Sequence, residues 1–334
     1  MTHPLLLCTN SFRDIPLSEL AVSSSDWGYD GFEAVLGVGH WDLVAHSKDG
    51  GFLESTRDLL GRHRLDIPII AAHGLTTVLC DPIGQYSRKI LPTHVYGDGD
   101  PNGIRDRAMV EIQSLLRSAE AFGIGLLSGF TGSPIWSRFW TYPAPNSEEI
   151  EDAFNLVATR FQPVLDGCLD SGIRFALEVH PGQMAFDVSS ASRLLDSLGG
   201  HQALGFTLDP AHLVWQGVDP VQFVRAFPDR IWHVHLRDVF TRLDGTSSLL
   251  NPSIHPHPAS HLGGVRGSAP VEYRAPGRGS IDWDSLIREL ARVGYAGAFS
   301  VEAKDPDLDR AVIAAESASW ARRLLRLLSG RHSA

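Results

Sequence analysis

The chain has 334 residues, 43% of them hydrophobic and 20% charged, and a formal net charge of −10 at pH 7. The apolar fraction supports a large core and excludes a disordered chain. The acidic balance argues against binding to nucleic acid or to an anionic membrane surface, because both need clustered basic side chains. Three scattered cysteines without a Cys-x-x-Cys pair predict neither a disulfide framework nor a structural zinc site. The short N-terminal apolar run and the lack of a membrane-length apolar segment predict a soluble, cytoplasmic protein.

Eight short and almost continuously apolar segments are expected to form strands. In chain order they are 5–9, 31–36, 69–73, 125–131, 174–180, 204–209, 231–236 and 298–302. Continuous rather than alternating hydrophobicity is typical of parallel strands that are covered on both faces. Amphipathic segments with apolar residues at helical spacing lie between them. They are 105–122, 147–172, 187–198, 219–227, 283–293 and 307–328.

This alternation predicts an α/β protein that forms a (β/α)₈ TIM barrel in a single domain over residues 1–334. A doubly wound sheet is the competing fold, but no G-x-G-x-x-G follows the first strand. Two connections are longer than the pattern requires, 76–102 after the third strand and 241–279 after the seventh. We expect 241–279 to be a loop insertion at the active site, because long connections in compact domains usually serve function.

Four consecutive predicted strands, the fifth to the eighth, end in ionisable side chains. These are Glu178 and His180, Asp209 and His212, His235 and Arg237, and Glu302 and Lys304. In such a barrel the active site lies at the C-terminal ends of the strands, and buried carboxylates repel one another unless a cation compensates. Three carboxylates and an imidazole suit a divalent ion. We therefore expect Glu178, Asp209, His235 and Glu302 to bind one ion, with Mn²⁺ ahead of Mg²⁺, Co²⁺ and Zn²⁺, and His233 to lie deeper in the core.

Further polar residues near the predicted strand ends are candidates for substrate contact. They are Glu33, His40, His73, His212, Arg237 and Lys304. Aromatic side chains are expected to wall the pocket or to pack in the core, because sugar faces stack well on aromatic rings. They are Phe130, Trp136, Phe139, Trp140 and Trp215.

The motifs E-V-H, L-D-P-A-H, H-V-H-L-R-D, G-R-G-S-I-D-W and S-V-E, taken in this order, resemble those of the xylose isomerase-like TIM barrels. The resemblance extends over nearly the whole chain. It implies that Glu178, Asp209, His235 and Glu302 are metal ligands and that His212 contacts substrate. In related ketose epimerases the first and last glutamates also act as bases on opposite faces of the substrate, which implies this role for Glu178 and Glu302.

The expected chemistry is proton removal next to the carbonyl of a sugar or keto-sugar. A metal that chelates the carbonyl oxygen and an adjacent hydroxyl makes the neighbouring C–H more acidic and stabilises the enediolate. A carboxylate then removes the proton, and His180 and His212 orient hydroxyls or donate a proton. The sequence therefore predicts a metal-dependent isomerase or epimerase, with a small-molecule sugar or glycoside as its substrate.

Two departures from the ketose 3-epimerase pattern keep a second enzyme class open. Met184 stands where those enzymes have a second glutamate, and Thr241 stands where they have an arginine. The long connection after the seventh strand is similar to that of inosose dehydratases and of C-glycoside deglycosidase catalytic subunits. The alternative is thus a lyase that works by β-elimination, and its deglycosidase form would need a small partner subunit. An apurinic-site endonuclease and a non-catalytic sugar-binding barrel are weaker alternatives, and the sequence leaves a homo-oligomer open.

Overall fold

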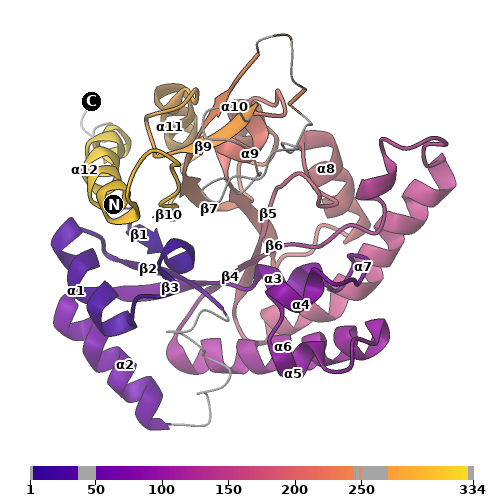
Figure 1. The fold of residues 1–334 in the computed structure, drawn as a ribbon, viewed down its shortest axis with the longest axis horizontal. Coiled ribbons are helices and arrows are strands. Elements are labelled where there is room, and N and C mark those ends of the chain that lie inside the picture. Colours follow the sequence, from indigo (N-terminus) through magenta and orange to yellow (C-terminus); the bar gives the residue numbers. More distant parts are fainter. Residues whose placement is uncertain (1–2, 37–49, 244, 246–247, 250–269, 330–334) are drawn as a thin grey trace.

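The structure is a computed structural model that describes residues 3–36, 50–243, 245, 248–249 and 270–329. His40 and most of the connection 241–279 lie outside the described residues. Eight parallel strands form a closed barrel at the centre of the molecule (Figure 1). They are β1 (Leu5–Cys8), β2 (Gly31–Val35), β3 (Asp66–Ala71), β4 (Leu126–Gly129), β5 (Arg174–Glu178), β6 (Leu204–Leu208), β7 (Ile231–Leu236) and β10 (Ala298–Val301).

The barrel closes where β1 pairs with β10, which brings the first and the last strand of the barrel side by side (Figure 1). Almost every strand residue is buried, as continuous apolar segments require. Helices surround the strands. The larger ones are α1 (Leu17–Trp27), α2 (Gly50–His63), α6 (Pro101–Phe122), α7 (Ser147–Asp170), α8 (Val188–Ser197), α10 (Pro220–Ala226), α11 (Trp283–Arg292) and α12 (Arg310–Ser329). The predicted (β/α)₈ barrel is confirmed.

Short helices follow the strands on the side where the strands end. They are η1 (Thr9–Phe12), α3 (His73–Thr77), α4 (Ser87–Ile90), α5 (Thr93–Tyr96), η2 (Trp136–Arg138) and α9 (Pro210–Val214). The long connection 76–102 therefore contains helical structure that the sequence did not predict. Among the described residues, no helix is both long enough and apolar enough to cross a membrane.

Several predicted boundaries are wrong, among them the ends of the fourth and fifth strands, which lie at Gly129 and Glu178, and both ends of the third strand. The third strand begins at Asp66 rather than at residue 69, because Ile67 is buried although Asp66 and Pro68 have the composition of a turn. The same strand ends at Ala71, so His73 begins α3 instead of ending β3. The predicted loop 241–279 also contributes a strand, β9 (Val271–Arg274), which pairs antiparallel with β8 (Asp238–Thr241) just beyond β7.

Candidate active site

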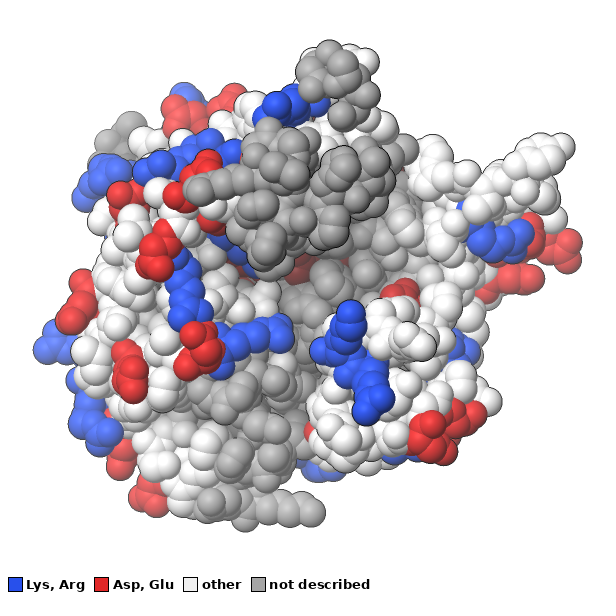
Figure 2. Space-filling model, viewed as in Figure 1, with Lys and Arg blue, Asp and Glu red and all other residues white. Residues whose placement is uncertain are grey.

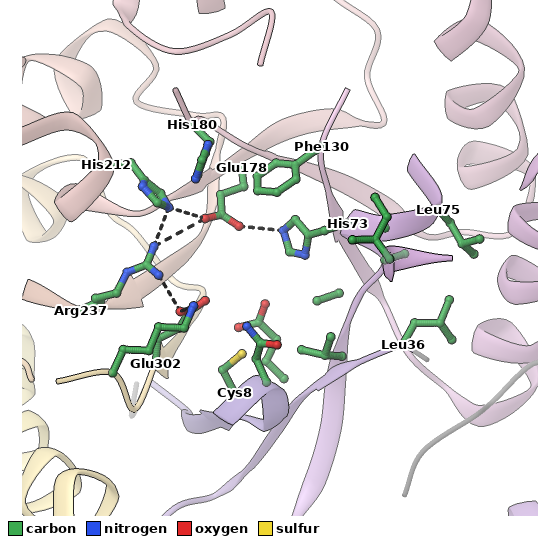
Figure 3. Close-up of a pocket in the computed structure, with 18 of the residues that line it drawn as sticks. Cys8, Leu36, His73, Leu75, Phe130, Glu178, His180, His212, Arg237 and Glu302 are labelled. Carbon is green, nitrogen blue, oxygen red and sulfur yellow. Dashed lines mark hydrogen bonds and ion pairs between the residues drawn. The ribbon is translucent and has the colours of Figure 1, made fainter. Parts of the chain in front are cut away.

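The C-terminal ends of the barrel strands surround a cavity of about 830 Å³. The space-filling view is hollowed near its centre, and Lys and Arg side chains lie on both sides of the hollow (Figure 2). Eight of the residues expected at the site line this cavity, namely Glu33, His73, Glu178, His180, His212, Arg237, Glu302 and Lys304. Figure 3 shows Glu178 between His73 on one side and His212 and His180 on the other. The cavity therefore lies where the residues expected at the strand ends come together.

The four residues expected to bind metal converge on one ring nitrogen of His235. His235 Nδ1 lies 3.3 Å from Asp209 Oδ2, 3.8 Å from Glu178 Oε1 and 4.0 Å from Glu302 Oε1. Two ligand atoms that each lie about 2.1 Å from one ion are roughly 3–4 Å apart, so these separations fit a shared cation. All four side chains are buried.

Chain topology explains this convergence. Glu178 is the last residue of β5, Asp209 directly follows β6, His235 lies near the end of β7, and Glu302 directly follows β10. The ends of these neighbouring parallel strands meet at one rim of the barrel. Asp209 is held further by its place at the start of α9, where its side chain accepts a hydrogen bond of 2.9 Å from the backbone N–H of Ala211.

Among the described residues, two groups of three side chains have ligand atoms close enough together to hold a metal ion. One is Glu33, His233 and His235, and the other is Glu178, Asp209 and His212. The predicted ligands are divided between these groups, and Glu302 belongs to neither. The first group is already a connected hydrogen-bond network, whereas the second contains two of the expected carboxylate ligands.

Arg237 lies among the carboxylates rather than free in the cavity. It forms an ion pair with Asp209, its Nη1 lies 2.6 Å from Glu302 Oε2, and its Nη2 lies 4.0 Å from Glu178 Oε1. Lys304 Nζ lies 2.7 Å from the same oxygen of Glu302. Burial alone would raise the pKa of the Glu302 carboxyl, but Arg237 and Lys304 outweigh it and lower this pKa to about 2. Glu302 is therefore ionised and paired with two cations.

Histidines flank Glu178 instead. His73 Nε2 lies 2.7 Å from Glu178 Oε2, and His212 Nε2 lies 3.1 Å from Glu178 Oε1. Burial would raise the pKa of the Glu178 carboxyl, but the neighbouring imidazoles, His235 foremost, outweigh burial and lower it. Burial lowers the pKa of His180 to about 3, so this ring is neutral where it packs edge-on against His212, with 3.9 Å between ring centroids.

Glu33 lines the cavity and also contacts two histidines. It is fully buried, with its carboxylate 3.2 Å from His233 Nε2 and 3.1 Å from His235 Nε2. An acceptor on Nε2 directs Nδ1 of His235 toward Asp209, as carboxylates behind metal-binding histidines do. His233 also contacts the backbone carbonyl of Ala298 through Nδ1 at 3.0 Å, which agrees with the core position expected for it.

Tyr273 of β9 was not among the site residues predicted from the sequence. Its hydroxyl lies 3.1 Å from His212 Nδ1, and its ring lies under the Arg237 guanidinium at 4.3 Å from the ring centroid. Its signal in the sequence was an aromatic side chain within Val271–Arg274, a segment of the connection whose composition predicts a loop. Only the pairing of β8 with β9 brings it to the site.

The chain matches the family model of the xylose isomerase-like TIM barrel over residues 23–324. Among curated proteins, it is 30% identical over 159 residues to an inosose dehydratase of Clostridium botulinum (strain Alaska E43 / Type E3), which is 47% of this chain and 50% of that protein. It is 29% identical over 136 residues to an uncharacterised protein, YfiH, of Bacillus subtilis (strain 168), which is 40% of each chain. The chain spans about half the length of the curated relatives it matches.

Solved structures of similar fold cover almost the whole chain. A 3-keto-D-glucoside 4-epimerase from E. coli has a TM-score of 0.65 at 15% identity and covers 96% of this chain and 99% of its own. A xylose isomerase-like TIM barrel protein from Mycobacterium smegmatis in complex with magnesium has a TM-score of 0.66 at 15% identity and covers 98% of both chains. At these identities the likeness establishes the fold alone. The match to the family model over residues 23–324 shows that this chain belongs to the xylose isomerase-like TIM-barrel family.

Proposed function

We propose that this chain is a divalent-metal-dependent enzyme that removes a proton next to the carbonyl of a keto-sugar, as an isomerase or epimerase. The observation that carries the proposal is the approach of Asp209, Glu178 and Glu302 to within 4.0 Å of His235 Nδ1, beside a large cavity that Glu178 and Glu302 line. Relatives named as inosose dehydratases and a structural neighbour named as a 3-keto-D-glucoside 4-epimerase support an enzyme that acts on sugars.

The donor set fits a divalent cation. The site contains four buried carboxylates. In the described part of the chain, only two permanent cations, Arg237 and Lys304, lie among them, so the site retains negative charge. The carboxylates are those of Glu33, Glu178, Asp209 and Glu302. Oxygen ligands with one imidazole suit Mn²⁺, which we place first, and also Mg²⁺, Co²⁺ and Zn²⁺. Solved neighbours carry magnesium or zinc. Held by Glu178, Asp209, His235 and Glu302, such an ion would polarise a substrate carbonyl as a Lewis acid.

The protein's own side chains supply the proton transfer. Glu178 is our candidate base, because it lines the cavity and is ionised. His73 and His212 contact its two carboxylate oxygens and hold the group in place. Glu302 is more firmly engaged, by Arg237 and Lys304. We assign it to cation binding first and to proton transfer on the opposite face second, and Lys304 to the orientation of a substrate hydroxyl.

A lyase is the second candidate, and the inosose dehydratase relatives favour it. Elimination starts with the same proton removal and then needs an acid for the departing oxygen. His212 and His180 lie together next to Glu178 and would orient that oxygen. The ammonium of Lys304, which also lines the cavity, would donate the proton. A deglycosidase of this kind would also use a partner subunit, which co-purification from the native host would reveal.

Metal content and isotope exchange test the proposal together. Purified protein should hold about one divalent ion per chain by elemental analysis, and Glu302→Gln should lose most of it. The matched control is Glu316→Gln, an exposed glutamate paired with Arg278 on the surface. In D₂O the enzyme should place deuterium next to the carbonyl of a ketose, an inosose or a 3-keto-glucoside. A product of equal mass identifies an isomerase, and loss of water or an aglycone identifies a lyase. Undiminished metal in Glu302→Gln, or no exchange with any of these compounds, would refute the proposal.

A further inference from the structure

The cavity is larger than one sugar ring requires. A free hexose or cyclitol has about twelve non-hydrogen atoms, and at no more than roughly 30 Å³ per atom, the volume of a water molecule, it fills at most about 360 Å³. The cavity measures about 830 Å³, which lies in the upper part of the roughly 300–1,000 Å³ range of pockets that hold drug-sized ligands. More than half of the space therefore remains when one ring lies over the carboxylates.

Several apolar side chains also line the cavity. Trp136, at the start of η2, packs on Phe186 with 4.9 Å between ring centroids, and Trp140 follows in the turn after η2. Ile90 and Leu91, from the end of α4 on the β3 side, also line the cavity. Trp140 is 72% exposed and Ile90 is 43% exposed. Large apolar groups that line a cavity while exposed are typical of ligand contacts.

We propose that this apolar region, made by Trp136, Trp140, Ile90 and Leu91, is a subsite for the aromatic aglycone of a glycoside. The inference rests on the proposed function, because it places the sugar ring at Glu178 and Glu302. It names the substrate class as an aryl glycoside of a keto-sugar, rather than a free ketose or inosose.

The lining chemistry favours an aromatic aglycone over a second sugar. A second sugar would bring several hydroxyl groups, and each loses free energy when it is buried without a hydrogen-bond partner. The four subsite residues offer no side-chain carboxylate or amide for them. A flat aromatic ring, by contrast, gains from contact with two indoles and two aliphatic side chains. Trp215, which also lines the cavity, has a buried indole N–H with no hydrogen-bond partner among the described residues. It is available to a single ligand oxygen such as the one that links sugar and aglycone.

Binding of unreactive glycosides tests the subsite apart from catalysis. We would measure affinities of 4-nitrophenyl glucoside, methyl glucoside and cellobiose by calorimetry, with metal-loaded protein. The aryl glucoside should bind about ten-fold more tightly than the methyl glucoside, and Trp140→Ala should reduce this preference about three- to ten-fold. Trp140 is exposed, so its removal should leave the fold intact. The matched control is Tyr142→Ala, a fully exposed aromatic on the same segment that does not line the cavity.

The outcomes separate the two proposals. Equal affinity for aryl and methyl glucosides, tighter binding of cellobiose, or an aryl preference that Trp140→Ala leaves unchanged would overturn the subsite. Deuterium exchange into a methyl 3-keto-glucoside under the same conditions reports the proposed function alone. Exchange without an aryl preference refutes the subsite and leaves the function standing. An aryl preference without exchange refutes the function, and the aromatic-binding region remains.

Discussion

Glu33 offers the sharpest test of how the site is organised. It is fully buried, and its carboxylate lies 3.2 Å from His233 Nε2 and 3.1 Å from His235 Nε2. We expect Glu33→Gln to keep the side-chain shape but to remove the charge that both imidazoles share. Glutamine replaces one carboxylate oxygen by an NH₂ group, which donates and therefore cannot accept from the ring N–H of His235. The His235 ring then loses its fixed orientation, and Nδ1 no longer faces the three carboxylate ligands reliably.

The expected magnitudes follow from burial and from the role of the partner. Loss of a carboxylate behind a metal-binding histidine typically weakens metal affinity about 10- to 100-fold. Removal of one member of a buried ion pair costs about 3–5 kcal/mol of unfolding free energy. We expect Glu33→Ala to approach this loss of unfolding free energy, because the His233 and His235 rings are fully buried and would lack their carboxylate partner. Glu33→Gln should lose less stability and still show the full loss of metal affinity.

Calorimetric titration of metal-free protein with Mn²⁺, together with urea unfolding, measures both effects. Glu289→Gln is the control, since Glu289 is a buried glutamate that is paired with Arg225 and Arg292 and does not line the cavity. It should lose stability without a change in metal affinity. Metal affinity within about two-fold of wild type in Glu33→Gln would refute the orienting role. A raised KM with unchanged metal affinity would restore the direct substrate contact that the sequence predicts.

Three other predictions test parts of the fold around the site. Asp238 accepts hydrogen bonds from the backbone N–H groups of Gly277 and Ile281 and from Trp283 Nε1 at 2.9–3.2 Å. Asp238→Asn should therefore lose about 3 kcal/mol in urea unfolding, and a loss below about 1 kcal/mol would contradict this role. Tyr273→Phe should slow deuterium exchange about ten-fold at unchanged KM, because it removes the hydroxyl that holds His212; an unchanged rate would exclude this role. Burial raises the thiol pKa of Cys80 and Cys168 to about 12 and that of Cys8 well above its usual value. Thiols with raised pKa stay protonated, so a disulfide reagent at pH 8 should label all three only after denaturation, and rapid native labelling would disprove this.

Local sequence pattern was sufficient for the barrel. Continuous apolar segments with helices between them allow few other folds, because both faces of each strand must be covered. The pattern also placed the ionisable residues at strand ends, and strand ends meet at one rim in this topology. For this reason the sequence predicts Glu178, Asp209, His235 and Glu302 as one group, and the distances to His235 Nδ1 fit this prediction.

Contacts between distant segments were decided by the tertiary structure alone. Glu33 and His235 are 202 positions apart, and nothing in either segment indicates that one carboxylate serves two rings. Tyr273 reaches His212 only because β9 pairs with β8, and a short strand within a polar connection leaves no periodic signal. His73 contacts Glu178 from a helix start rather than from a strand end. The sequence by itself therefore determined which chemical groups gather at the barrel rim, because the order of the parallel strands brings their C-terminal ends to that rim. Their pairing depends on side-chain directions and on loop packing, which only the folded chain sets.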